Sequence, residues 1–179
     1  MPYRLLSKAL LFAAEMHDGD YREGAFGLPY STHPFEVCTL LRYVGGETDP
    51  ELLCVAALHD VLEETNTSAA EIEAEFGLRV CHLVQELTRT EPTPEEALGF
   101  SKEDLWRYRS NLLLADILRM SVEAQKVKLA DRLANLRQAK ITRTGEKLRR
   151  YERQSKKILE IIPKSVNPAL WKAIASEFA

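Results

Sequence analysis

One short segment of the chain combines an apolar run with four side chains that can bind a metal or move protons. Residues 52–62 are almost entirely leucine, valine, alanine and cysteine, which is typical of a helix buried on all sides. His59 and Asp60 nevertheless lie inside this run, and Glu63 and Glu64 follow directly. Because an ionised carboxylate is strongly disfavoured in an apolar interior, Asp60 predicts a cation, a network of donors or a wet cavity beside it.

A histidine and three carboxyl groups within six residues suit a metal site with water-activating groups next to it. Glu63 lies one helical turn after His59, and Glu64 lies one turn after Asp60, so the acids extend the same two helix faces. This segment alone leaves an alternative open: a helix with a buried first half and a solvated second half, whose glutamates are merely exposed.

Two further residues raise the same question elsewhere in the chain. His33 stands where a loop gives way to a helix. On a helical wheel, Asp131 points away from a stripe formed by Leu129, Leu133 and Leu136, and small or apolar residues surround it. We therefore expect this helix to be buried on both sides. A shared divalent metal would satisfy both buried carboxylates, with the ligand set His33, His59, Asp60 and Asp131. Imidazole and carboxylate ligands together suit Mn, Fe or Zn without choosing among them.

The elements that must position these residues are all predicted to be α-helices. Glycine and proline fall between segments of helical periodicity, and strand alternation does not occur. Ser68 with Glu71 three residues later predicts a capping box at one helix start. The fold class is therefore all-α, a bundle of about eight to ten helices. The predicted helices span residues 3–18, 34–45, 50–64, 68–75, 77–89, 101–118, 121–139, 143–161 and 167–177.

Two longer connections separate these helices, at residues 19–32 and 90–100. The first holds glycines, tyrosines and charged residues. The second holds two prolines and a run of acids, and it is a candidate lid over a site, although most loops of this kind are only connections.

Charge is distributed unevenly along the chain. Residues 126–157 contain 12 Lys/Arg and 3 Asp/Glu, a local charge of +9, whereas the remainder contains 12 Lys/Arg and 24 Asp/Glu. Such a basic stretch can attract an anion, although a solvated helix face gives the same pattern. The net charge of -3 and the lack of a recognisable nucleic-acid motif argue against nucleic acid as a partner.

The composition favours a globular cytoplasmic protein. A hydrophobic content of 45% allows a sizeable core, and no apolar run approaches the roughly 18 residues of a membrane helix, so no membrane partner is expected. The N-terminal segment is interpreted as an amphipathic helix rather than a secretory signal. Cys38, Cys54 and Cys81 are an odd number in apolar surroundings, which indicates buried, reduced thiols.

Taken in order, these residues resemble the HD superfamily of metal-dependent phosphohydrolases, in which a histidine is followed by a His-Asp pair and a later aspartate. The motifs read THP at 32–34, HDVLEET at 59–65 and KLADRLANLR at 128–137. They are similar to the hydrolase domain of the RelA/SpoT enzymes, and especially to the free-standing small alarmone hydrolases. Further matches are His17, Arg22, Gly27, Pro29 and Tyr30, EFGLRVCHLVQELT at 75–88, and RRYERQSKKIL at 149–159.

The resemblance implies one HD-type domain over residues 1–179 that hydrolyses the 3′-pyrophosphate of ppGpp or pppGpp, giving GDP or GTP and pyrophosphate. It implies manganese as the usual metal, held by the four ligands named above. Glu63 and Glu64 match the acidic pair that activates water and handles protons. The implied nucleotide contacts are Arg22, Asn135 and Tyr151, and Lys128 would add positive charge near the phosphates.

Three positions depart from the family pattern. Glu64 stands where the family usually has aspartate, Glu23 where it has a basic residue, and Asp20 where it has glutamine. None of the three is a metal ligand, so we expect an active enzyme. Two alternatives remain: an HD phosphohydrolase acting on another phosphorylated nucleotide such as NADPH, and a metal-bound nucleotide sensor without turnover. The motifs run from His17 to Tyr151, which leaves no room in 179 residues for a synthetase half.

Overall fold

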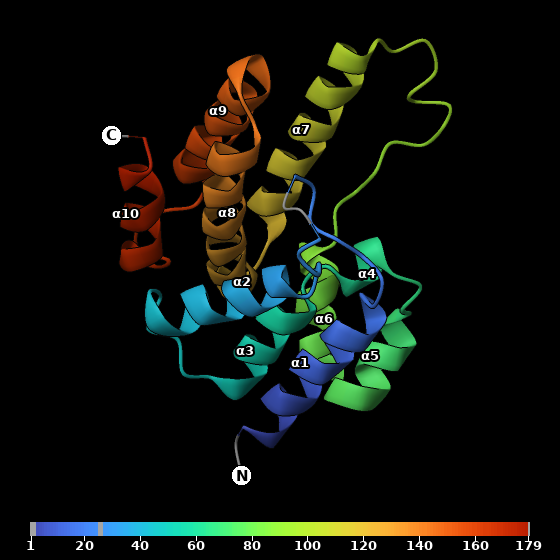
Figure 1. Ribbon diagram of the computed structural model, residues 1–179, viewed down its shortest axis with the longest axis vertical. Helices are drawn as coiled ribbons and strands as arrows, with labels where there is room; N and C mark the ends of the chain where they lie inside the picture. The colour runs from blue at the N-terminus through green and yellow to red at the C-terminus, as the bar shows by residue number, and fades with distance from the viewer. Residues whose placement is uncertain (1–2, 25–26, 179) are drawn as a thin grey trace.

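The computed structural model describes residues 3–24 and 27–178. Within them the chain forms ten helical segments and no strand, which confirms the all-α prediction (Figure 1). None of these helices is both long and apolar enough to cross a bilayer. The helices are α1 (Arg4–Met16), α2 (Thr32–Tyr43), α3 (Pro50–Leu58), α4 (Val61–Glu64), α5 (Ala69–Phe76), α6 (Leu78–Leu87), α7 (Lys102–Arg119), α8 (Val122–Thr142), α9 (Gly145–Ile161) and α10 (Pro168–Ser176).

The helices form two groups that share one long helix. Helices α1, α2 and α6 pack against the apolar α3, and α5 packs on α6. Helices α7, α9 and α10 form the second group, with α7 and α10 both against α9 (Figure 1). Helix α8 contacts α2, α3 and α6 in the first group and α9 and α10 in the second, so it joins the two.

Helix α8 is buried on both sides, as its sequence predicts. Leu129, Leu133 and Leu136 are fully buried, and Val127 and Ala134 are fully buried as well. Each buried leucine contributes about 1.5–3 kcal/mol relative to an exposed one, so the register of this helix is strongly fixed. Any polar side chain projecting from α8 between these positions is therefore held at a defined place.

Local signals in the sequence set where several helices begin. The capping box of Ser68 and Glu71 is present at the start of α5, as predicted. Asp49 caps α3 by accepting a hydrogen bond from the Glu51 N–H, and Pro50 occupies the first turn, where its missing N–H costs nothing. These caps satisfy N–H groups that the helices themselves leave unpaired.

The predicted continuous helix at residues 50–64 is wrong, because the structure breaks it after Leu58. His59 and Asp60 form a turn between α3 and the single-turn helix α4, and Asp60 has φ −117° and ψ −1°. Successive side chains on an unbroken helix diverge by about 100°. The break turns Asp60 so that it and His59 both reach the same cavity.

The first long connection is a closed loop rather than a loose one. Tyr21 and Pro29 form an antiparallel bridge, and the Arg22 N–H donates to the Leu28 carbonyl at 3.0 Å. Gly24 has φ +74°, and a Cβ at this position would lie 2.9 Å from Cβ of Thr142 at the end of α8. Only glycine therefore allows this loop to lie so close to α8.

The second connection, residues 90–100, runs from the end of α6 to the start of α7 (Figure 1). Thr90 at its beginning donates to Asp116 of α7 through both its N–H and its hydroxyl, at 3.1 and 3.2 Å. Tyr108 of α7 donates to Glu96 at 3.0 Å. These contacts tie the loop to α7, and its role as a lid stays a prediction.

The three cysteines are free and buried, as the sequence predicts. Burial raises the pKa of Cys38 to about 11 and that of Cys54 to about 12. Because the thiolate is the reactive form, these raised pKa values disfavour reaction of the two thiols at neutral pH.

Candidate metal centre and cavity

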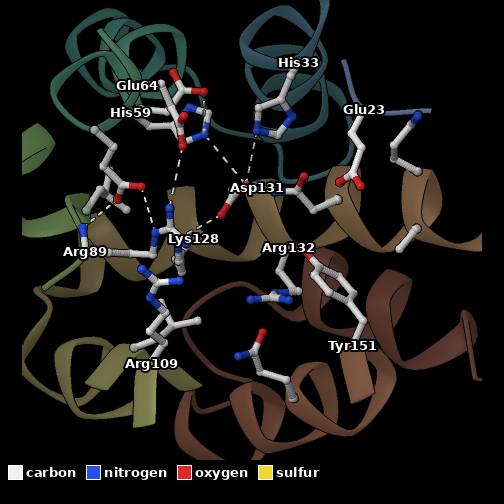
Figure 2. A pocket seen from close by; sticks show the side chains of 18 of the residues that line it. Glu23, His33, His59, Glu64, Arg89, Arg109, Lys128, Asp131, Arg132 and Tyr151 are labelled. Carbon is white, nitrogen blue, oxygen red and sulfur yellow. Dashed lines mark hydrogen bonds and ion pairs between the residues drawn. The ribbon is translucent and has the colours of Figure 1, made fainter. Parts of the chain in front are cut away.

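The four predicted metal ligands lie together. His33, His59 and Asp60 each present one ligand atom, and these atoms all lie within 4.8 Å of one another. Oδ1 of Asp131 is 3.4 Å from Nε2 of His33 and 3.7 Å from Nε2 of His59 (Figure 2). The residues come from the first turn of α2, the turn between α3 and α4, and the middle of α8. All four are only 4–6% exposed.

The hydrogen bonding of His59 leaves one ring nitrogen facing the cluster. Its Nδ1 lies 2.9 Å from the Ala56 carbonyl oxygen, which can only accept, so Nδ1 carries the hydrogen. In the neutral ring the lone pair is then on Nε2, the atom that faces Asp60 and Asp131. A backbone carbonyl that fixes the tautomer in this way is typical of a metal-binding histidine.

The charges in the cluster favour a cation. Burial alone would lower the pKa of His59, but the negative charges of Asp60 and Asp131 outweigh it and raise that pKa to about 9. Burial would raise the pKa of Asp60, yet the charges of His59, His33 and His17 hold it well below its usual value. Oδ2 of Asp60 is buried and has no hydrogen-bond partner in the described part of the chain. Two imidazoles and two carboxylates, one with a free buried oxygen, fit a divalent metal ion.

Two residues predicted to bind substrate hold Asp131 in place in this structure. Lys128 Nζ donates to Oδ2 of Asp131 at 2.9 Å, and the Asn135 amide donates to Oδ1. Burial alone would raise the pKa of Asp131, but the charge of Lys128 and the hydrogen bonds of His33 and His59 hold it well below its usual range. Lys128 and Asn135 therefore touch the metal cluster as well as the cavity.

Two aromatic rings beside the cluster were not among the predicted site residues. His17 is buried, and its Nε2 lies 3.3 Å from Oδ1 of Asp60, within hydrogen-bonding distance. Tyr30 lies against both His17 and His33, with ring centroids 4.6 and 5.9 Å away. Burial, and then the charge of Asp60, raises the pKa of Tyr30 far above its usual value. Both residues match the family pattern in the sequence, but the pattern did not predict that they contact Asp60 and the metal cluster.

The acidic pair is asymmetric. Glu63 accepts hydrogen bonds from Arg89 on both carboxylate oxygens, from the backbone N–H at 2.6 Å and from Nε at 2.8 Å. Glu64 lies 3.6 Å from Arg89 Nη2, and its side chain is 45% exposed, against 15% for Glu63. Glu63 is therefore held in an ion pair, whereas Glu64 is the freer carboxylate.

All ten predicted site residues line one cavity of about 540 Å³. Its walls come from the loop before α2, the α3–α4 turn, α7, α8 and α9. The cavity therefore brings together every predicted residue, while the roles assigned to them remain predictions. Lining residues that the sequence reasoning did not assign include Arg89, Trp106, Arg109, Ser110, Arg143 and Gln154. Arg89 directly follows the motif that ends at Thr88, but no local sequence pattern predicted that it would line the cavity.

Positive and negative side chains balance in the lining of this cavity. The described lining contains six cationic residues, Arg22, Arg89, Arg109, Lys128, Arg132 and Arg143, and six acidic ones, Glu23, Asp60, Glu63, Glu64, Glu91 and Asp131. Histidines aside, the lysine and arginine charges of the lining are thus matched in number by acidic ones, and a bound divalent cation would add positive charge.

One wall of the cavity is an aromatic ring flanked by arginines. The ring of Tyr151 in α9 lies 4.6 Å from the guanidinium carbon of Arg132 and 4.9 Å from that of Arg143. Arg143 also lies 3.6 Å from Glu23. Arg22 donates to Glu36 of α2 at 3.1 Å. Glu23, which stands where the family has a basic residue, therefore has a positive partner next to the end of α8.

The comparison with known families decides the assignment, because the family model described as the HD domain matches residues 9–161. This chain is an HD-domain protein. The HD-domain protein is 38% identical over 136 residues to guanosine-3′,5′-bis(diphosphate) 3′-pyrophosphohydrolase MESH1 of Xenopus tropicalis, covering 76% of this chain and 70% of that one. MESH1 of Homo sapiens is 36% identical over 132 residues, covering 74% and 68%.

A solved structure shares the whole fold. It is described as a metazoan ortholog of SpoT that hydrolyzes ppGpp, and it superimposes with a TM-score of 0.84 at 30% identity. The match covers 99% of the HD-domain protein and 96% of that chain. The comparisons confirm the resemblance to small alarmone hydrolases that the sequence motifs indicated.

Proposed function

We propose that this HD-domain protein is a metal-dependent hydrolase with one HD-type domain over residues 1–179, which removes pyrophosphate from the 3′ position of ppGpp or pppGpp. The observation that carries the proposal is the convergence of His33, His59, Asp60 and Asp131 in one buried cluster. The relatives named for this reaction, and the superimposed ppGpp-hydrolysing protein, support the choice of substrate.

The charge of the cavity supports a metal requirement. Histidines aside, the lining holds equal numbers of cationic and acidic residues, so it has little positive charge of its own to attract a substrate that carries several phosphates. A divalent ion, for which we propose manganese, would supply positive charge to a phosphoryl oxygen and lower the pKa of a water molecule. His33, His59, Asp60 and Asp131 would hold it, and His17 and Lys128 would orient the two carboxylates.

Glu64 is the proposed proton acceptor for the attacking water. It is the freer of the two acids, since Glu63 already accepts two hydrogen bonds from Arg89. In the proposed step the water oxygen bonds to the phosphorus next to the ribose, and the bond from that phosphorus to O3′ breaks. One water proton passes to Glu64, and a proton is returned to O3′, which leaves a 3′-hydroxyl and pyrophosphate. Glu63 then serves to position Arg89.

The remaining predicted residues are proposed to bind the nucleotide. Arg22 and Tyr151 lie on the cavity wall and can contact a base by stacking or hydrogen bonding. Asn135 and Lys128 already bind Asp131, so their free donors can reach a phosphate only next to the metal cluster. We expect their loss to weaken metal and substrate binding together.

A nucleotide panel tests this function. Purified protein is incubated with ppGpp and Mn²⁺, and GDP and pyrophosphate are quantified over time. We expect multiple turnovers that stop with a chelator and with His59→Ala or Asp60→Ala. His82→Ala is the matched control, since His82 is exposed and does not line the cavity. Absence of both products at high enzyme concentration refutes the proposal.

A second candidate is the same reaction class on another phosphorylated nucleotide, such as NADPH. The observation that favours it is Glu23 in the cavity wall. Glu23 replaces a basic residue of the family, and it pairs with Arg143. The same panel decides between them by the ratio of kcat/KM values. Tight nucleotide binding with no product would instead favour a sensor.

The proposed compartment is the cytoplasm. Buried free thiols at Cys38, Cys54 and Cys81 suit a reducing environment, and guanine nucleotides are available there.

A further inference from the structure

Arg132 differs in its surroundings from the other charged residues of the cavity. It is only 4% exposed, and its Nε and Nη1 are buried with no hydrogen-bond partner among the described residues. Its guanidinium carbon lies 4.6 Å from the centre of the Tyr151 ring, and it lines the cavity next to Asp131 (Figure 2).

Every other cation in the described lining has a carboxylate partner within 4 Å. Arg22 pairs with Glu36, Arg89 with Glu63, Arg109 with Glu91, Lys128 with Asp131, and Arg143 with Glu23. Arg132 has no such partner in the described part of the chain. The charge of Arg132 is therefore the one in the described lining that no protein carboxylate compensates.

A buried guanidinium with unpaired N–H groups is unfavourable unless an anion completes it. Its planar fork of donors matches two oxygens of a phosphate group. The Tyr151 ring packs against the guanidinium, so less freedom is lost when a phosphate binds. Because α8 is locked in the core, the side chain cannot simply turn out to solvent with its helix.

We propose that Arg132 binds a phosphate group of the substrate, from either its 3′- or its 5′-diphosphate, through the N–H groups of its guanidinium. This inference rests on the proposed function for the nature of the substrate, but the phosphate-binding site at Arg132 itself needs no metal. It adds to the metal cluster a second anchor, one residue further along α8, which would fix how a diphosphate lies in the cavity.

Binding to the full-length chain after metal removal tests the proposal. Inorganic pyrophosphate represents the 3′ group, and GDP represents the 5′ group, each titrated by calorimetry in the presence of a chelator. Arg132→Gln is expected to weaken one of the two by about ten- to 100-fold, the usual effect of losing a charge-assisted hydrogen-bond pair. Arg137→Gln is the control, because Arg137 lies on the same helix but pairs with Glu177 outside the cavity.

A stability measurement shows whether Arg132 binds a ligand or stabilises the fold. If the charge of Arg132 is uncompensated, the ligand-free Arg132→Gln protein should melt no lower than wild type, and it should lose the increase in Tm that the bound probe gives. A marked fall in ligand-free Tm with unchanged affinities indicates a structural residue and overturns the proposal.

Unchanged affinity for both probes overturns the proposal whatever the Tm, and so does a wild-type protein that binds neither. Loss of GDP binding alone assigns Arg132 to the 5′ group, and loss of pyrophosphate binding alone assigns it to the 3′ group. If ppGpp is not hydrolysed but Arg132-dependent binding of either probe is found, the proposed function is refuted and the phosphate-binding role of Arg132 is supported.

Discussion

Glu64→Gln should damage catalysis far more than Glu63→Gln, although the two acids are neighbours in the sequence. Removing a positioned general base typically costs 10²–10⁴ in rate, and we expect a loss of about this size in kcat for Glu64→Gln. The KM should change little, because the substitution keeps the shape of the side chain. Mn²⁺ affinity should also be kept, since Glu64 is not among the proposed ligands.

The smaller effect expected for Glu63→Gln follows from its ion pair. Glu63 acts through Arg89, and the side chain of Arg89 is 43% exposed, so solvent screens the pair. Such a pair is worth about 1 kcal/mol or less, which corresponds to about fivefold in kcat. Arg89→Gln breaks the same pair and should cost about as much.

Steady-state kinetics on the single variants and on the double variant Glu63→Gln with Arg89→Gln provide the assay. If both residues act through one pair, the double variant should be no worse than either single one. Glu95→Gln is the control, because Glu95 is exposed and does not line the cavity. A loss for Glu63→Gln that equals the loss for Glu64→Gln, or additive losses in the double variant, would refute the reasoning.

Three further outcomes are expected. The proton that His59 binds in the metal-free protein, with a pKa of about 9, must leave when metal binds, so the Kd for Mn²⁺ should fall up to about tenfold per unit from pH 7 to 9; a pH-independent Kd in calorimetry contradicts this. His17→Ala should weaken Mn²⁺ binding about 10–100-fold by releasing Asp60, again read by calorimetry, and affinity within twofold of wild type would exclude that role. Gly24→Ala should cost about 1–2 kcal/mol in unfolding free energy and raise KM, because a left-handed residue with a side chain is strained against Thr142; unchanged denaturation and kinetics would contradict the packing argument.

The clustering of the proposed metal ligands was predictable because burial and charge conflict within single segments. Asp60 and Asp131 each stand among apolar residues, so their sequences alone demand a partner, and the order of the motifs supplies His33 and His59. Helix positions followed from periodicity in the same way. The break at His59 did not follow, since an apolar run does not reveal where a helix turns to aim two side chains at one point.

The cavity wall was less predictable, because its contacts join residues far apart in the chain. Arg89 is 26 positions from Glu63, and nothing in either segment indicates that Arg89 donates to both carboxylate oxygens of Glu63, one from its backbone N–H and one from its side chain. The basic stretch predicted an attraction for anions, but only the structure separates Arg132, which has no carboxylate partner among the described residues, from the paired arginines. Such pairing depends on tertiary packing, which local patterns do not encode.

Helix α8 carries Asp131 and Arg132 on a backbone whose other side chains form the centre of the core. Opening the site by moving this helix would require unfolding both groups of helices, so its amides should exchange with solvent only through global unfolding. Metal or nucleotide binding raises the free energy of global unfolding, so it should slow the exchange of the α8 amides. Amides of the chain ends, which exchange through local opening, should change little.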